Sequence, residues 1–330
     1  MTLSPTVISL LAASSLTAAM TLAAALLGVV ILRGWDPASG SELQLRLERH
    51  TYLVSTILGV VLFFRIPALF LFIAFADSMS GSIVGAMCAF GSFHVNSHGF
   101  PALLLNVLFA LMSGVWLIIN RLDAQGYDYP LIRVKYRFLL IMAPLAVAGA
   151  VEEFRFFGNI APDVITSCCG SLFSQRPGVE ISDIFVLPVP PLYTLVLLVG
   201  GAIVVSPLLQ GRWGYAPLLQ GGASIISFPL SIVFVIAAVS PYVYELPTHH
   251  CPFCILKQEY HFVGHLLYGT LLISTVTGIG AGISWYWRKI PSLSQVIPRF
   301  SRRISIVSSL SHLIFLVVST LCITLSNLRT

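Results

Sequence analysis

Residues 100–120 read FPALLLNVLFALMSGVWLIIN, and these 21 residues decide the fold class because they contain no Asp, Glu, Lys or Arg. A run of about 20 apolar residues is long enough to cross the hydrocarbon core of a bilayer as a helix. The rest of the chain has the same character: of its 330 residues 57% are hydrophobic and 9% are charged. Soluble domains carry about 25% charged residues. The sequence therefore predicts a polytopic integral membrane protein.

Seven further segments share this apolar character, so we expect an all-α bundle of about eight transmembrane helices that forms a single domain over 1–330. The expected spans are about 7–32, 51–76, 100–120, 137–159, 189–209, 222–242, 263–287 and 304–327. The first span lacks the basic start and cleavage site of a signal peptide and is interpreted as a retained helix. Small residues in the spans favour close helix packing, and we expect this role for Gly221, Gly222, Gly278, Gly280 and Gly282.

Basic residues alternate between the loops. Most of the 18 Lys and Arg residues follow the first, third, fifth and seventh spans. Positive charge stays on the cytoplasmic side, so both termini and the loops 77–99, 160–188 and 243–262 are predicted to face outward. The net charge of +5 is then a property of membrane-flanking loops and does not indicate a nucleic-acid partner. We expect a bacterial inner membrane protein whose outer loops face the periplasm or the exterior.

All six cysteines fall on the predicted outer side. Cys88, Cys168, Cys169, Cys251 and Cys254 lie in the three outer loops, and Cys322 lies near the outer end of the last span. This is the oxidising side of a membrane, where disulfides persist. Six of the eight histidines join them: His94, His98, His249, His250, His261 and His265. In helical segments, the first two and the last two of these histidines would form pairs at i, i+4 spacing. The loops are therefore predicted to form a Cys/His-rich layer.

The outer loop before the seventh span contains THHCPFCILKQEYHF, residues 248–262. A CPFC sequence at this place predicts the first turn of a helix, because proline is favoured there. The helix dipole and the adjacent histidines would then favour the Cys251 thiolate. In the leading hypothesis the protein is a thiol–disulfide oxidoreductase or electron relay: Cys251 attacks, Cys254 resolves, and Cys168, Cys169 and Cys88 exchange disulfides.

CPFC resembles the glutaredoxin-type active-site tetrapeptide. Cysteine pairs on the outer face of a helical bundle are similar to those of the quinone-linked disulfide-forming membrane oxidoreductases, including the vitamin K epoxide reductase type. This resemblance implies a quinone near the CxxC pair and a soluble thioredoxin-like or electron-transfer partner outside the membrane. The chain departs from these families in having eight expected spans rather than a four-helix core, and in its vicinal second pair, Cys168 and Cys169.

Two alternatives use the same residues differently. Thiolate and imidazole ligands suit Cu(I), Zn or Fe–S centres, so the chain can instead be a metal-binding or metal-transporting protein. Its expected ligands are His249, His250, Cys251, Cys254, His94, His98, His261 and His265. In the other alternative the cysteines form structural disulfides in a scaffold or in a subunit of a membrane complex. The sequence leaves all three hypotheses open.

One arginine lies inside the membrane. Arg65 falls about halfway along the second span, where a charge is costly and requires a partner. Glu152 and Glu153, in the outer half of the fourth span, are the expected partners. Together the three residues predict a polar pocket for a quinone headgroup, a proton or a transported ion. The alternative is a buried ion pair that fixes the packing of the helices.

Overall fold

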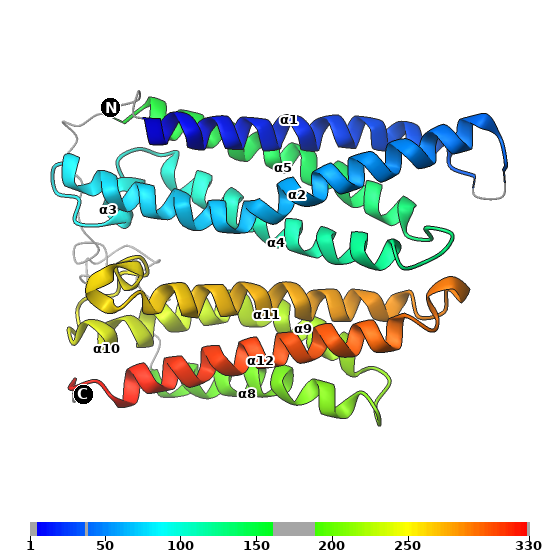
Figure 1. Cartoon of the computed structure of the whole chain (residues 1–330). Coiled ribbons are helices and arrows are strands. Elements are labelled where there is room, and N and C mark those ends of the chain that lie inside the picture. The colour runs from blue at the N-terminus through cyan, green and yellow to red at the C-terminus, as the bar shows by residue number, and fades with distance from the viewer. Residues whose placement is uncertain (1–4, 37–38, 161–188, 329–330) are drawn as a thin grey trace. The chain divides into compact units, whose positions relative to one another are not determined.

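The structure is a computed structural model that describes residues 5–36, 39–160 and 189–328 (Figure 1). These residues form helices and loops, and eight helices are long and apolar enough to cross a membrane. The predicted all-α membrane fold is thereby confirmed. The chain divides into two compact units, which we describe separately. Unit 1 comprises Met1–Ile73, Asn96–Ala161 and Trp287–Ile297, and unit 2 comprises Ala74–Val95, Pro162–Tyr286 and Pro298–Thr330.

Unit 1 is built around helix α5. It contains α1 (Pro5–Gly34), most of α2 (Glu42–Met79), α4 (Gly99–Asp123), α5 (Ile132–Gly158) and the short 3-10 helix η5 (Pro291–Leu293). Helix α5 packs against both α1 and α4. Its Tyr136 is fully buried, and a Cβ at Gly28 of α1 would lie 2.8 Å from the tyrosine ring. Glycine at this position therefore allows the two helices to approach closely.

A buried ion pair closes the connection between α4 and α5. Lys135 Nζ lies 2.8 Å from Asp123 Oδ2 and also donates to Asn120 Oδ1 at 3.1 Å. The other carboxylate oxygen of Asp123 accepts the Leu131 amide at 2.8 Å. The side chains of the pair are at most 3% exposed. Lys135, counted in the sequence as one of the basic loop residues, thus also fixes the turn between the two helices.

Unit 2 carries the remaining long helices. They are α8 (Val189–Leu209), α9 (Ala216–Phe234), α11 (Val263–Tyr286) and α12 (Ile297–Thr324). A π-helix, η2 (Val235–Val239), joins α9 directly to α10 (Ser240–Tyr244), so the sixth span is one long element. The short elements are η1 (Ser80–Ser82), α3 (Ala89–Phe93), η3 (Cys254–Leu256) and η4 (Gln258–Tyr260). Helix α9 packs against both α8 and α11.

Small residues bring α9 and α11 together. A Cβ at Gly221 would lie 2.9 Å from the Cα of Gly282, and a Cβ at Gly278 would overlap the Ser224 hydroxyl. The predicted close-packing role is confirmed for these three glycines. It is wrong for Gly222, where a Cβ would meet no atom within 4 Å, because this residue lies on the exposed side of α9.

Helix α12 joins unit 2 through polar contacts. Ser308 Oγ donates to the Ser274 carbonyl of α11 at 2.8 Å. Halfway along α12, the buried His312 lies against Gly200 of α8, where a Cβ would approach Nε2 to 2.7 Å. These contacts bury polar groups of α12 against its neighbours, while apolar side chains such as Leu310 and Val317 remain exposed for lipid.

Candidate functional site

Three cysteines meet at the end of unit 2 where α10 ends and α11 begins. The sulfur atoms of Cys88, Cys251 and Cys254 all lie within 4.8 Å of one another. The Sγ atoms of Cys88 and Cys251 are 3.4 Å apart. We call these residues the three-thiol cluster. It joins the predicted outer loops 77–99 and 243–262, while Cys168 and Cys169 lie outside the described residues.

The local backbone around CPFC differs from the expected helix start. Cys251 precedes a turn, Cys254 begins the 3-10 helix η3, and α11 begins only at Val263. The residues before α11 make a second 3-10 turn and then two left-handed positions, His261 (φ 54°) and Phe262 (φ 55°). The prediction that CPFC opens the α-helix is therefore wrong. The helix-dipole argument for a Cys251 thiolate loses its basis.

An ion pair links the two segments that carry the cluster. Lys257 Nζ lies 3.4 Å from Asp77 Oδ1 and donates to the Met87 carbonyl at 3.1 Å. The same carboxylate oxygen accepts the Ala89 amide at 2.9 Å. We call this pair the Asp77–Lys257 clip. Partial burial lowers the pKa of Lys257, but the Asp77 carboxylate and any negative charge on Cys254 and Cys88 outweigh burial, so this pKa lies above its usual value.

Three side-chain hydroxyl groups contact the backbone carbonyls of the CPFC turn. The Tyr244 hydroxyl donates to the Cys251 carbonyl at 2.5 Å, and the Ser240 hydroxyl lies 3.4 Å from the same oxygen. The Tyr268 hydroxyl of α11 donates to the Pro252 carbonyl at 2.7 Å. These contacts satisfy buried carbonyl groups that no regular helix would satisfy here. They hold the backbone of Cys251 in place before any ligand binds.

The cluster is shielded from solvent. Cys88 and Cys251 are 0% exposed, and Cys254 is 7% exposed. The rings of Phe93 and Phe253 pack beside the cluster with their centroids 5.6 Å apart. Hydrogen bonds with the other two thiols, followed by burial, raise the pKa of Cys254 above its usual value. Without a metal ion, Cys254 therefore favours its neutral thiol over the thiolate.

The predicted histidine pairs do not form on single helices. Helix α3 ends at Phe93 and α4 begins at Gly99, so His94 and His98 lie at the ends of two different helices. His261 precedes α11, whereas His265 lies in its first turn. Both i, i+4 expectations are wrong because turns interrupt the helical periodicity. His98 contacts Glu152 in unit 1, with Nδ1 2.8 Å from Oε2.

The two histidines before Cys251 are close to the three-thiol cluster in sequence but do not belong to it. Within the described residues, the potential metal ligands that lie within 4.8 Å of one another are the three cysteine sulfurs, without an imidazole nitrogen. His250 Nδ1 lies 3.1 Å from the Ile236 carbonyl of the π-helix, so Nδ1 carries the proton of that contact. The ring of His249 contacts Tyr244 edge to face, and its buried Nε2 has no hydrogen-bond partner within the described part of the chain.

The buried arginine of unit 1 has the expected partner. Arg65 lies 3.2 Å from Glu153 Oε1, which confirms the predicted ion pair. Glu152 points elsewhere and contacts His98 and, at 3.1 Å, Arg155. Sequence reasoning missed Asn106, whose Nδ2 lies 2.6 Å from Glu153 Oε1. The sequence contains a signal for this residue, because Asn106 is a polar side chain within the apolar run PALLLNVLFA, residues 101–110.

The fold and the cluster together define a multi-pass helical membrane protein with a buried three-thiol site at one end of its second unit. Searched against protein-family models, curated proteins and solved structures, the chain gives no match.

Proposed function

We propose that this membrane protein binds a thiophilic metal ion through Cys88, Cys251 and Cys254. The observation that carries the proposal is the convergence of three sulfur atoms within 4.8 Å, one pair at 3.4 Å. Sulfur ligands bind zinc at about 2.3 Å, which separates neighbouring sulfurs by about 3.8 Å in a tetrahedral site and about 4.0 Å in a trigonal one. The cluster needs only small side-chain movements to reach these separations.

Burial favours a metal site over thiol exchange with a soluble protein. Exchange requires a sulfur atom that the partner can reach, and Cys88 and Cys251 have no exposed surface. A metal ion is small enough to enter during a local opening of the loops. On binding, three S–H bonds are replaced by three metal–sulfur bonds, and three protons leave to solvent. The metal thereby stabilises the Cys254 thiolate, which is disfavoured without a metal ion.

The ligand set favours Cu(I) over Zn²⁺. Thiolates select soft ions such as Cu(I), and structural zinc almost always takes four ligands, whereas the described cluster offers three. Of the two histidines before Cys251, His249 is the candidate fourth ligand that a zinc site would need, because its buried Nε2 has no hydrogen-bond partner within the described residues. The distribution of Lys and Arg supports placing the cluster on the extracytoplasmic side. We infer a role in metal acquisition, storage or transport at that face.

One observation favours a second candidate, an internal dithiol relay. The 3.4 Å separation of the Cys88 and Cys251 sulfurs needs to shorten to about 2.05 Å for a disulfide to form. In that reaction the two thiols lose two protons and two electrons to an oxidant such as a quinone. Cys254 would then be the thiol that attacks the new disulfide, in agreement with a thiol–disulfide oxidoreductase or electron relay.

Anaerobic metal titration with parallel thiol counting distinguishes the two candidates. Purified reduced protein in lipid is titrated with Cu(I) and with Zn²⁺. The C88S/C251S/C254S variant lacks the proposed ligands, and the C322S variant is the control. We expect one Cu(I) per chain in the wild type and in C322S, loss of three titratable thiols on binding, and no tight site in the triple variant. Equal metal binding by the triple variant would overturn the metal site. A Cys88–Cys251 disulfide with no metal binding would establish the relay instead.

A further inference from the structure

Each of the four helices of unit 1 contributes one polar side chain to a network inside the membrane. Ser14 of α1, Arg65 of α2, Asn106 of α4 and Glu153 of α5 are all at least nine-tenths buried. Glu153 Oε1 contacts both Arg65 and Asn106, at 3.2 Å and 2.6 Å. Polar groups at this depth are costly to bury and mark functional paths more often than packing contacts.

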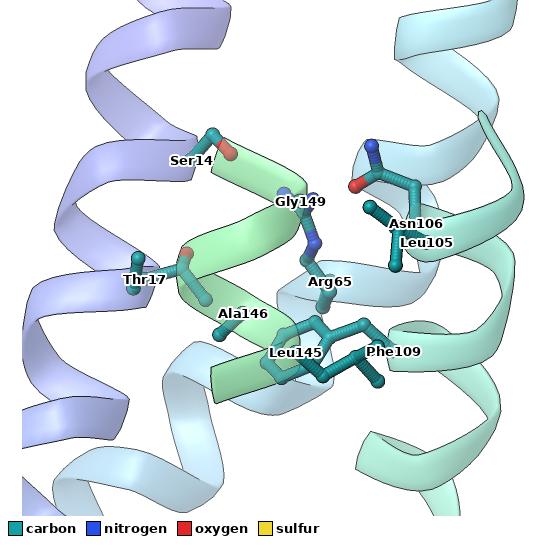
Figure 2. A pocket seen from close by; sticks show the side chains of 10 residues that line it. Ser14, Thr17, Arg65, Leu105, Asn106, Phe109, Leu145, Ala146 and Gly149 are labelled. Carbon is teal, nitrogen blue, oxygen red and sulfur yellow. The ribbon is translucent and has the colours of Figure 1, made fainter. Parts of the chain in front are cut away.

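A cavity of about 10 Å³ lies against this network (Figure 2). Ser14, Arg65 and Asn106 line it together with Thr17 of α1, and Phe109 and Leu145 are among its apolar walls. Figure 2 shows the Arg65 side chain reaching in from α2 between α5 and α4. The volume suits one water molecule, which requires two to four polar partners. A guanidinium has five N–H donors, and the hydrogen bond to Glu153 occupies one of them, so Arg65 can donate to that water.

The geometry points to a proton-binding site formed by Glu153 and this water-sized cavity beside Arg65. The hydrogen bonds from Arg65 and Asn106 both end on Glu153 Oε1, so a proton on Oε2 leaves these two intact. The Ser14 hydroxyl also hydrogen-bonds the Glu153 side chain. Protonation turns the carboxylate into a carboxylic acid and leaves the Arg65 charge unbalanced. The Phe109 ring, with its centroid 5.7 Å from the guanidinium carbon, stabilises that charge.

A short route connects the site to water. Glu153 lies five residues before the end of α5 at Gly158, about 8 Å along the helix axis. Beside it, Glu152 is 19% exposed and His98 is 28% exposed, and the two side chains are 2.8 Å apart. Arg155 completes the charged groups at this rim, while α1 faces Glu153 with hydroxyl groups and α4 with an amide. A proton can therefore enter through the His98–Glu152 pair and reach Glu153, which follows Glu152 directly on α5.

Infrared difference spectroscopy in lipid nanodiscs tests this proposal. Acidification of the wild type should produce the C=O band of a protonated carboxyl, which shifts in D₂O and is missing in E153Q. The E42Q variant is the control, because Glu42 is exposed on α2, and it should keep the band. E152Q should keep the band but delay its deuterium shift severalfold. An unchanged exchange rate in E152Q would remove the His98–Glu152 route from the proposal.

A second variant covers the case in which E153Q does not fold. R65Q retains Glu153 but removes the cation that holds it ionised, so its protonated-carboxyl band should be present already at neutral pH. The proposal would be overturned if the protonated-carboxyl band persisted in E153Q. It would also be overturned if neither the wild type nor R65Q showed this band while folded. The metal-binding cluster is not involved in this readout, so the two proposals stand or fall independently.

Discussion

The Sγ atoms of Cys88 and Cys251 lie 3.4 Å apart although 163 positions separate them in the sequence. The contact joins the segment after α2 to the turn before α11. With Cys254 it completes a buried set of three sulfurs, and thiolate sulfur is a ligand that soft metal ions such as Cu(I) favour.

Removing one sulfur should weaken metal binding strongly. C251S is expected to lower Cu(I) affinity at least about tenfold, because it replaces a thiolate with a hydroxyl that soft metals bind poorly. Competition with a Cu(I) chelator of known affinity measures the change. C322S should bind as the wild type does, and equal affinity in C251S and C322S would contradict the ligand assignment.

The Asp77–Lys257 clip should matter for affinity although neither residue is a ligand. D77N and K257M each remove the contact that joins the two cysteine-bearing segments. Loss of such outer contacts typically costs roughly 10- to 100-fold in metal affinity. The double variant should lose less than the sum of the two single losses, because both substitutions break the same ion pair. Additive losses from the two substitutions would show that they act separately.

The packing of the CPFC turn on α11 can be tested with paired glycine substitutions. A Cβ at Gly264 would lie 2.7 Å from Ile255 Cγ1 and 2.9 Å from the Ile255 carbonyl carbon, whereas a Cβ at Gly269 would meet nothing within 4 Å. G264A should therefore destabilise the protein by about 1–3 kcal/mol. G269A should be neutral or slightly stabilising, since alanine favours helix. Thermal unfolding in the same detergent compares them, and equal midpoints would contradict the described packing.

A second glycine pair tests the contact between α9 and α11. G221A should disturb the bundle, because its Cβ would approach the Gly282 backbone to 2.9 Å. G222A, one residue away, faces open space and should leave unfolding unchanged. The readout is the fraction of monodisperse protein after heating. Damage from G222A but not from G221A would mean that the face of α9 is assigned wrongly.

The sequence predicted the spans well because length and apolar character alone select membrane helices. It placed the fourth span at 137–159, whereas α5 begins at Ile132, since the helix continues through Lys135. The cost of burying that lysine is offset by Asp123, twelve residues away, and by Asn120. Such a pairing depends on how a turn closes and leaves no hydropathy signal.

The candidate site was predictable in composition but not in detail. Alternating charge and gathered cysteines indicated that loops 77–99 and 243–262 share a site, and the three-thiol cluster joins them. The histidines were harder to place, because imidazoles also serve as partners for carbonyls and carboxylates. His250 contacts the Ile236 carbonyl and His98 contacts Glu152. Neither contact follows from spacing along the chain.

X-ray absorption at the copper edge of the Cu(I)-loaded protein is the most direct test of the three-thiol metal site. The account predicts three sulfur scatterers at about 2.3 Å in the wild type and two in C88S. A first shell dominated by nitrogen or oxygen, or a sulfur count unchanged in C88S, would contradict it.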